Sequence, residues 1–357
     1  MSRRRRRLAL AVGLPAGGAA IAAFTIALIT ALSSLAAPAP AGPAARLTLR
    51  PHPQPAPTRA VSSQLYSPFT GEPVRALEPV LAVKIDNIVD ARPQTGLQSA
   101  DIVYVIPVEG GLTRFMAIFS SHVPPVVGPV RSAREDDLNI LRQFGRPAFA
   151  WSGATPHLVP FIERAPIVDL YAITRPAGYY RDPDRVAPYN LYANTATLLS
   201  EAKGASKARD IGWRFGPAPA GGKATASQVV NFPAATYTFR WSARAKRWLV
   251  WMDGAPGMAA EGGQLGPSTV IIQYTFIRTS RFEEYGGLPP YAQTLGSGRA
   301  VILRDGRAYT AAWSRPSVNG GTIYRLPDGQ RMLFAPGQVW DVLAPENHES
   351  YVNAERV

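Results

Sequence analysis

Cysteine is absent from this chain of 357 residues. Its absence excludes disulfide bonds, a thiolate nucleophile, cysteine-ligated metals and a lipid attached to an N-terminal cysteine. Histidine is scarce as well: the chain has only His52, His122, His157 and His348, and no two of them have the spacing of metal ligands on one helix. No loop has the full glycine pattern of a cofactor site. We therefore expect neither a metal nor another cofactor.

Lysine is rare, with five among the 38 basic residues, and the first 63 positions contain no acidic residue. Those 63 positions hold eight arginines, so much of the net charge of +13 is concentrated there. The rest of the chain has 30 basic and 25 acidic residues, a net charge of +5. Binding to a phosphate backbone usually needs a concentrated basic face. We therefore expect no nucleic acid among the partners.

The first 63 residues do not have the pattern of a globular domain. Residues 3–7 are all arginine and predict a basic cytoplasmic tail over 1–7. Residues 8–37 carry no charge, and a helix of about 20 residues would cross a hydrocarbon core of roughly 30 Å. We predict a transmembrane anchor, with the membrane as a partner through this N-terminal helix. The protein would then be a single-pass protein of the cell membrane, with the body that follows outside the cytoplasm.

The alternative for residues 8–37 is a long signal sequence cleaved near Ala41, which would make the protein secreted. Residues 38–63 are rich in proline and alanine in either case. Such a composition favours an extended, solvated linker.

Two patterns of secondary structure follow the linker. Residues 66–210 contain apolar strand segments and then a helix at 135–144 that Ser132 and Glu135 would cap. After a loop rich in Gly, Pro and Ala at 216–222, residues 225–355 show short alternating runs separated by Asp-Gly pairs, which are strong hairpin signals. We predict a mixed α/β domain at 66–210 and a mainly antiparallel β domain at 225–355, an α+β fold class.

No catalytic motif survives a check of its chemistry. The run 216–223 is reminiscent of a phosphate-binding loop, but Ala224 stands where Ser or Thr would bind magnesium. Ser200 and Lys203 have the spacing of a Ser-x-x-Lys acyl transferase, but its companion motifs are missing. These failures favour a protein without enzymatic activity, although they leave the question open.

What remains is a set of polar side chains at strand ends and glycine-rich turns of the first domain, where sheets build clefts. Several arginines near a helix N-terminus suit recognition of a carboxylate or phosphate. The candidate ligand-binding residues are Asp86, Asn87, Arg92, Glu109, Arg114, Arg131, Ser132, Arg134, Arg181 and Asn190. The alternative is structural, with Arg92, Arg114 and Arg131 paired to Asp86, Asp101 and Glu109.

Short segments spread over residues 66–343 together resemble one known family. They include 67–73, Arg92-Pro93, 128–134, 187–192 and 335–340. In this order they resemble the YerB-like lipoprotein family of exported bacterial proteins, with the N- and C-terminal parts of domain of unknown function 3048. The resemblance implies layered sheets with helices on one side. Family members called lipoproteins carry a lipobox cysteine, which this chain lacks, so its tether would be the apolar helix.

These observations together predict a membrane-anchored envelope protein that is not catalytic. It would bind an anionic cell-envelope ligand, such as a peptidoglycan carboxylate, or an envelope protein partner. The alternative is a cell-wall hydrolase with Asp86 and Glu109 as a carboxylate pair. Arginines near both carboxylates argue against this alternative, because they favour ionised forms whereas a general acid needs a raised pKa.

Overall fold

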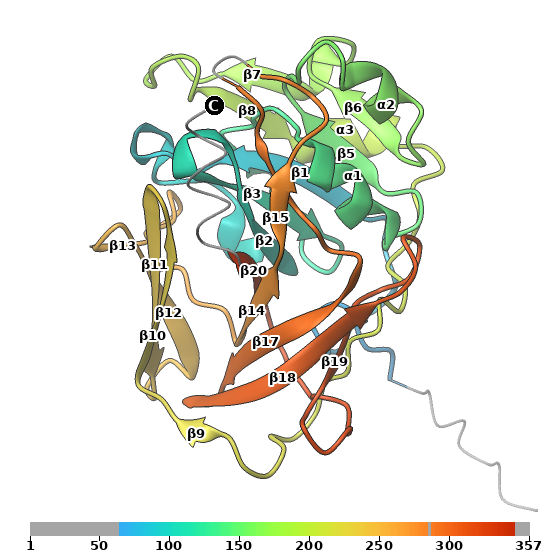
Figure 1. Cartoon of the computed structure of the whole chain (residues 1–357). Coiled ribbons are helices and arrows are strands. Elements are labelled where there is room, and N and C mark those ends of the chain that lie inside the picture. The colour runs from blue at the N-terminus through green and yellow to red at the C-terminus, as the bar shows by residue number, and fades with distance from the viewer. Residues whose placement is uncertain (1–63, 285–286, 347–357) are drawn as a thin grey trace, which may run out of the picture. The chain divides into compact units, whose positions relative to one another are not determined.

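A large mixed β-sheet dominates the computed structural model, which describes residues 64–284 and 287–346 (Figure 1). Eleven strands form this sheet. In spatial order they are β19 (Ile323–Arg325), β18 (Arg307–Arg315), β17 (Gly296–Arg304), β14 (Thr269–Thr275), β20 (Val339–Pro345), β2 (Ile102–Pro107), β3 (Thr113–Phe119), β1 (Leu81–Asp86), β5 (Ala148–Trp151) and β6 (Val168–Tyr171), with β9 (Lys223–Ala224) beside β18. Strand β20 runs parallel to both of its neighbours, β14 and β2.

Three smaller sheets and three α-helices complete the described residues. One sheet contains β10 (Ser227–Phe232), β11 (Ala235–Ser242), β12 (Arg247–Met252) and β13 (Ala255–Pro256). The others are β15 (Ile277–Thr279) with β16 (Pro290–Ala292), and β4 (Val126–Val127) with β8 (Leu191–Asn194) and β7 (Tyr179–Arg181). The helices are α1 (Glu135–Arg142), α2 (Val159–Glu163) and α3 (Thr195–Glu201).

The large sheet separates two hydrophobic cores. In β1, Ala82 belongs to one core, whereas Leu81 and Val83 belong to the other. This division follows from the alternation of side chains along a strand. All six residues of β1 are buried, because both faces of the sheet are covered, and its charged residues Lys84 and Asp86 are buried in ion pairs. The strands β11 and β12 instead alternate buried and more exposed residues, as in a sheet with one solvated face.

The predicted α+β fold class is wrong. The described residues contain three α-helices, none longer than eight residues, against twenty strands. Layered sheets with helices on one side are therefore not what the chain builds. The physical reason is the position of β20, which pairs with β14 on one side and β2 on the other. Strands from both predicted domains thus extend one mixed sheet.

The predicted transmembrane anchor also needs correction. No helix among residues 64–284 and 287–346 is long and apolar enough to cross a membrane. Helix α1 has eight residues, whereas a bilayer needs about 20 in a helix. The predicted tail, span and linker at 1–7, 8–37 and 38–63 lie outside the described residues. The signal-anchor helix, the membrane partner that depended on it and the single-pass location are thus not supported by any helix that the structure describes.

The division into domains at 66–210 and 225–355 stays a prediction. The loop at 216–222 between them lacks helix or strand and is mostly exposed. We expect limited proteolysis to cut there first, because exposed irregular loops are the preferred sites of nicking. The two fragments should separate on a denaturing gel but elute together in native gel filtration, because β2 and β20 pair across the cut. First cleavage elsewhere within residues 66–346 would contradict the predicted boundary, whereas a cut in the linker at 38–63 would not bear on it.

Candidate functional site

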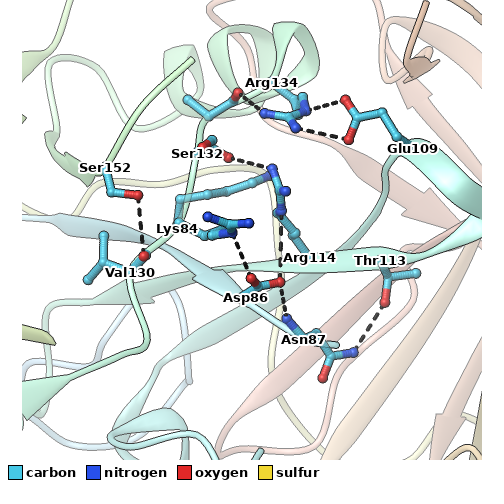
Figure 2. A network of polar contacts seen from close by, with 12 residues as sticks. Lys84, Asp86, Asn87, Glu109, Thr113, Arg114, Val130, Ser132, Arg134 and Ser152 are labelled. Carbon is cyan, nitrogen blue, oxygen red and sulfur yellow. Dashed lines mark hydrogen bonds and ion pairs between the residues drawn. The ribbon is translucent and has the colours of Figure 1, made fainter. Parts of the chain in front are cut away.

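The candidate site begins at the end of β1, where Asp86 is the last residue of the strand. The antiparallel register of β1 and β3 places Arg114 directly opposite Asp86. The loop that contains Arg131 is held against β1, because the Asp86 amide donates to Pro129 and the Arg131 amide donates to the Lys84 carbonyl, at 2.9 and 2.8 Å. Backbone pairing therefore brings two arginines, Arg114 and Arg131, to one carboxylate. Figure 2 shows Arg114 beside Asp86.

Asp86 is buried, with 1% of its side chain exposed. Its Oδ2 lies 2.7 Å from Arg131 Nε, an ion pair by distance that lacks the alignment of a hydrogen bond. Its Oδ1 accepts from the Asn87 amide at 2.9 Å and lies 3.9 Å from Arg114 Nε. Arg114 Nη1 also donates to the Ser132 carbonyl at 3.1 Å. The side chains of Asp86, Arg114 and Arg131 together carry one net positive charge.

A second ion-paired cluster lies beside the first, at the start of α1. Arg134 donates to both carboxylate oxygens of Glu109, at 2.5 and 2.9 Å (Figure 2). Its Nη1 also lies 3.3 Å from Glu284. Burial alone would raise the pKa of Glu109, but the charge and hydrogen bonds of Arg134 outweigh it, so this pKa lies below its ordinary value. Glu109 is therefore ionised at neutral pH.

Behind these clusters is a buried lysine–aspartate pair. Lys84 Nζ donates to Asp137 Oδ1 at 2.6 Å, and both side chains are fully buried. The neighbouring Asp136 is also buried, and its Oδ1 has no hydrogen-bond partner. Burial and then the charge of Asp137 raise the pKa of Asp136 to about 7. The buried side chains of Lys84, Asp136 and Asp137 support α1 and do not reach the surface.

Asn87 and Arg92 connect the site region to the four-stranded sheet. The side-chain nitrogen Nδ2 of Asn87 donates to the Thr113 hydroxyl at 3.2 Å and to the Tyr237 hydroxyl of β11 at 2.5 Å. Arg92 Nε donates to the Asn87 side chain at 3.2 Å, and Arg92 Nη1 lies 2.8 Å from Asp253. These contacts join two parts of the fold, which is a structural role.

A polar pocket of about 460 Å³ opens beside Arg131. Its polar lining consists of Arg131, Ser132, Ser152, Tyr179, Tyr180 and Arg181. No acidic side chain lines it. Arg131 stacks over the Tyr189 ring at 5.6 Å, and Arg181 Nη1 donates to Asn190 Oδ1 at 2.7 Å. Both cations therefore face the pocket without an acid beside them in its lining.

The structure thus divides the predicted site residues. Arg131, Ser132 and Arg181 line the pocket, and Asn190 holds Arg181. Asp86 and Arg114 lie behind Arg131, while Glu109 pairs with Arg134. Of the pairings in the structural alternative, those of Arg131 and Arg114 with Asp86 occur. Arg92 pairs instead with Asp253, and Asp101 accepts from the Ser121 backbone amide.

Sequence reasoning missed Ser152 and Tyr180 as pocket residues. Ser152 directly follows β5, which pairs in parallel with β1. The carboxyl ends of parallel neighbours meet at one edge of a sheet, so a pairing of these two strands would have placed Ser152 near Asp86. No metal-binding group of three or more His, Asp and Glu side chains occurs in the part of the chain that the structure describes.

Comparisons with known proteins define the class. Two family models, "Protein of unknown function (DUF3048) N-terminal domain" and its C-terminal counterpart, match residues 69–209 and 228–340. The chain belongs to this family, as its short segments predicted.

The chain is similar to "Putative lipoprotein YerB" of Bacillus subtilis (strain 168), with 27% identity over 313 residues that cover 80% of this chain and 88% of that protein. The crystal structure of YerB protein from Bacillus subtilis has the same fold, with a TM-score of 0.69 at 23% identity, covering 79% of this chain and 97% of that chain. The name of this relative, a lipoprotein, also conflicts with the predicted signal-anchor and single-pass location.

Proposed function

We propose that the protein is an envelope-associated binding protein that holds an anionic ligand in the pocket beside Arg131. The observation that carries the proposal is the lining of this pocket, where Arg131 and Arg181 face the same space with hydroxyl groups and without an acid. The relative's name as a lipoprotein supports a place in the cell envelope. A carboxylate of peptidoglycan or of an envelope protein fits this chemistry.

Arg131 is prepared for such a ligand before the ligand arrives. Its Nε lies 2.7 Å from Oδ2 of the buried Asp86, and this ion pair holds the side chain in place beside the pocket. A charge-assisted hydrogen bond to a partly shielded guanidinium is worth about 1.5–3 kcal/mol. Fixing the side chain in advance reduces the entropy that binding must offset.

The geometry does not favour the carboxylate-pair hydrolase. Asp86 is buried behind Arg131, so a substrate cannot reach it without displacing the ion pair. The pKa of Glu109 is lowered by Arg134 against the effect of burial, whereas a general acid needs a raised pKa. The pocket therefore supports binding better than hydrolysis.

We expect Arg181→Gln to weaken retention of the full chain on purified peptidoglycan sacculi at least about tenfold, since it removes one charge-assisted bond to the ligand. Sedimentation of the protein with sacculi measures the bound fraction. Arg181 is the cleaner position, because its side chain pairs with Asn190 and not with a buried acid. Arg131→Gln should act in the same direction, with thermal unfolding measured in parallel.

Arg244→Gln is the matched control, because Arg244 is an exposed arginine in the turn between β11 and β12. Its retention should equal that of the parent chain. Equal losses in all three variants would show unspecific charge binding and contradict the pocket. Release of soluble sugar or peptide fragments from the sacculi would favour the hydrolase instead.

A further inference from the structure

A second pocket, with a volume of about 450 Å³, lies between α1, the end of α2 and the segment of β15 and β16. It shares no lining residue with the pocket beside Arg131. Four arginines line it, and one carboxylate, from Glu135, lines it with them. The arginines are Arg142, Arg164, Arg278 and Arg281.

The sequence brings these side chains together from three elements. Glu135 and Arg142 are the first and last residues of α1, seven positions apart, so they lie on one face of the helix. Arg164 directly follows α2, where the helix ends. Arg278 lies in β15, and Arg281 follows it closely.

Glu135 is already satisfied by protein groups. Its Oε1 lies 2.7 Å from Arg281 Nε and 3.4 Å from Arg278 Nη2. Its Oε2 accepts from the Ser280 hydroxyl at 2.8 Å and from the Arg281 amide at 2.9 Å. Burial would raise the pKa of Glu135, but these hydrogen bonds and charges outweigh it and hold the pKa below its ordinary value. This carboxylate is therefore ionised and offsets one of the four positive charges.

The other side of the pocket carries cations without acidic partners. Arg142 Nε donates to the Asn319 side chain at 3.0 Å, and no acidic group lies within ion-pair distance of it among the described residues. Arg164 stacks over the Phe161 ring at 5.2 Å and likewise has no ion pair in residues 64–284 and 287–346. The lining thus has three more positive than negative charges. Such a concentration raises the local concentration of anions.

We propose that this second pocket binds an anion with two or more linked phosphate groups. Its volume lies in the range of small-molecule sites, about 300–1,000 Å³, and exceeds what one simple anion needs. A carboxylate is planar and matches one guanidinium through two parallel hydrogen bonds. A phosphate group offers three acceptor oxygens in different directions, which suits guanidinium groups that approach from three elements.

The proposal goes beyond the function proposed above, since it concerns other residues and another class of ligand. Pyrophosphate is the probe, added to the full chain at low ionic strength in a calorimetric titration. We expect Arg142→Gln combined with Arg164→Gln to weaken pyrophosphate binding about tenfold or more, because two cations without acidic partners are removed. These positions avoid the Glu135 ion pairs, and thermal unfolding should remain that of the parent chain.

Two control variants and one competing anion decide the result. Arg244→Gln changes an exposed arginine elsewhere, and Arg181→Gln changes the other pocket; both should keep the parent affinity for pyrophosphate. A negative result for the pocket beside Arg131 in the sacculus experiment would therefore not affect the pyrophosphate titration, which tests the second pocket. An equal loss in Arg244→Gln, or no heat of binding in the parent chain, would overturn the site. Citrate binding as tight as pyrophosphate would overturn its assignment to phosphate groups.

Discussion

Replacement of Lys84 by methionine should lower the free energy of unfolding by about 3–5 kcal/mol. Lys84 and Asp137 form an ion pair at 2.6 Å, with both side chains fully buried. Removing the ammonium leaves the Asp137 carboxylate without its counter-charge in a low dielectric, next to the buried Asp136. Urea unfolding followed by circular dichroism measures the loss.

The double variant Lys84→Met/Asp137→Asn separates the charge from the packing. Asp137 Oδ2 also accepts from the Arg134 amide at 2.7 Å, and the asparagine oxygen keeps an acceptor for that N–H at the start of α1. With both charges removed, the double variant should recover more than half of the loss. A single variant that loses less than about 1 kcal/mol would refute the argument, since burying an uncompensated charge is costly.

The substitution Asp341→Asn should make the protein more stable at alkaline pH than the parent chain. Asp341 is buried in the middle of the large sheet, where Tyr324 contacts its Oδ2 at 3.2 Å and its Oδ1 has no hydrogen-bond partner. Burial raises the pKa of Asp341 to about 8, against 3.8 as its ordinary value. The folded state therefore favours the protonated, neutral carboxyl.

The sign of the pH dependence follows from this shift. Because the folded pKa is the higher one, the stabilising contribution is complete below about pH 4 and is lost as the pH rises through about 8. One pKa unit corresponds to about 1.4 kcal/mol, so this shift of about four units gives a total change on the order of 6 kcal/mol. Asparagine does not titrate and should not show this change.

The measurement compares the two proteins by urea unfolding at several pH values from 4 to 9, a range set by the pKa shift of Asp341. All other titrating groups are common to both, so they cancel in the difference between variant and parent. This difference should increase with pH in favour of asparagine and level off above the folded pKa. A difference that is independent of pH would show that Asp341 is not neutral in the folded protein.

Local signals predicted the individual elements well. The strand expected at 80–86 is β1, which begins one residue later at Leu81, and the helix expected at 135–144 is α1, which ends two residues earlier at Arg142. Asp253 and Asp305, from two of the Asp-Gly pairs, have φ values of 53° and 49° in the turns between strands. Each of these features depends on residues within one short segment, which is the information that a sequence pattern carries.

The fold class failed because it depends on a pairing between distant residues. Strand β20 pairs with β2 in a register that joins Ile102 to Val339, and no local pattern reports such a partner. The residues of the two pockets could be predicted only in part, because some of them also come together from segments that are distant in the sequence. The charged residues near Asp86 are close in sequence to strand ends, whereas the second pocket combines arginines from three separate elements.

The central position of β20 in the large sheet has a consequence for the folding of the protein during its synthesis. During synthesis, residues 339–345 follow all the other strands that the structure describes, yet they form a central strand of the large sheet. Until they arrive, β2 and β14 each present an open edge, and such edges invite pairing with other chains. The large sheet can therefore be completed only after β20 has been made, and keeping the chain apart from its neighbours until then protects it from aggregation. A premature stop codon near residue 335 would remove the centre of the sheet rather than its margin.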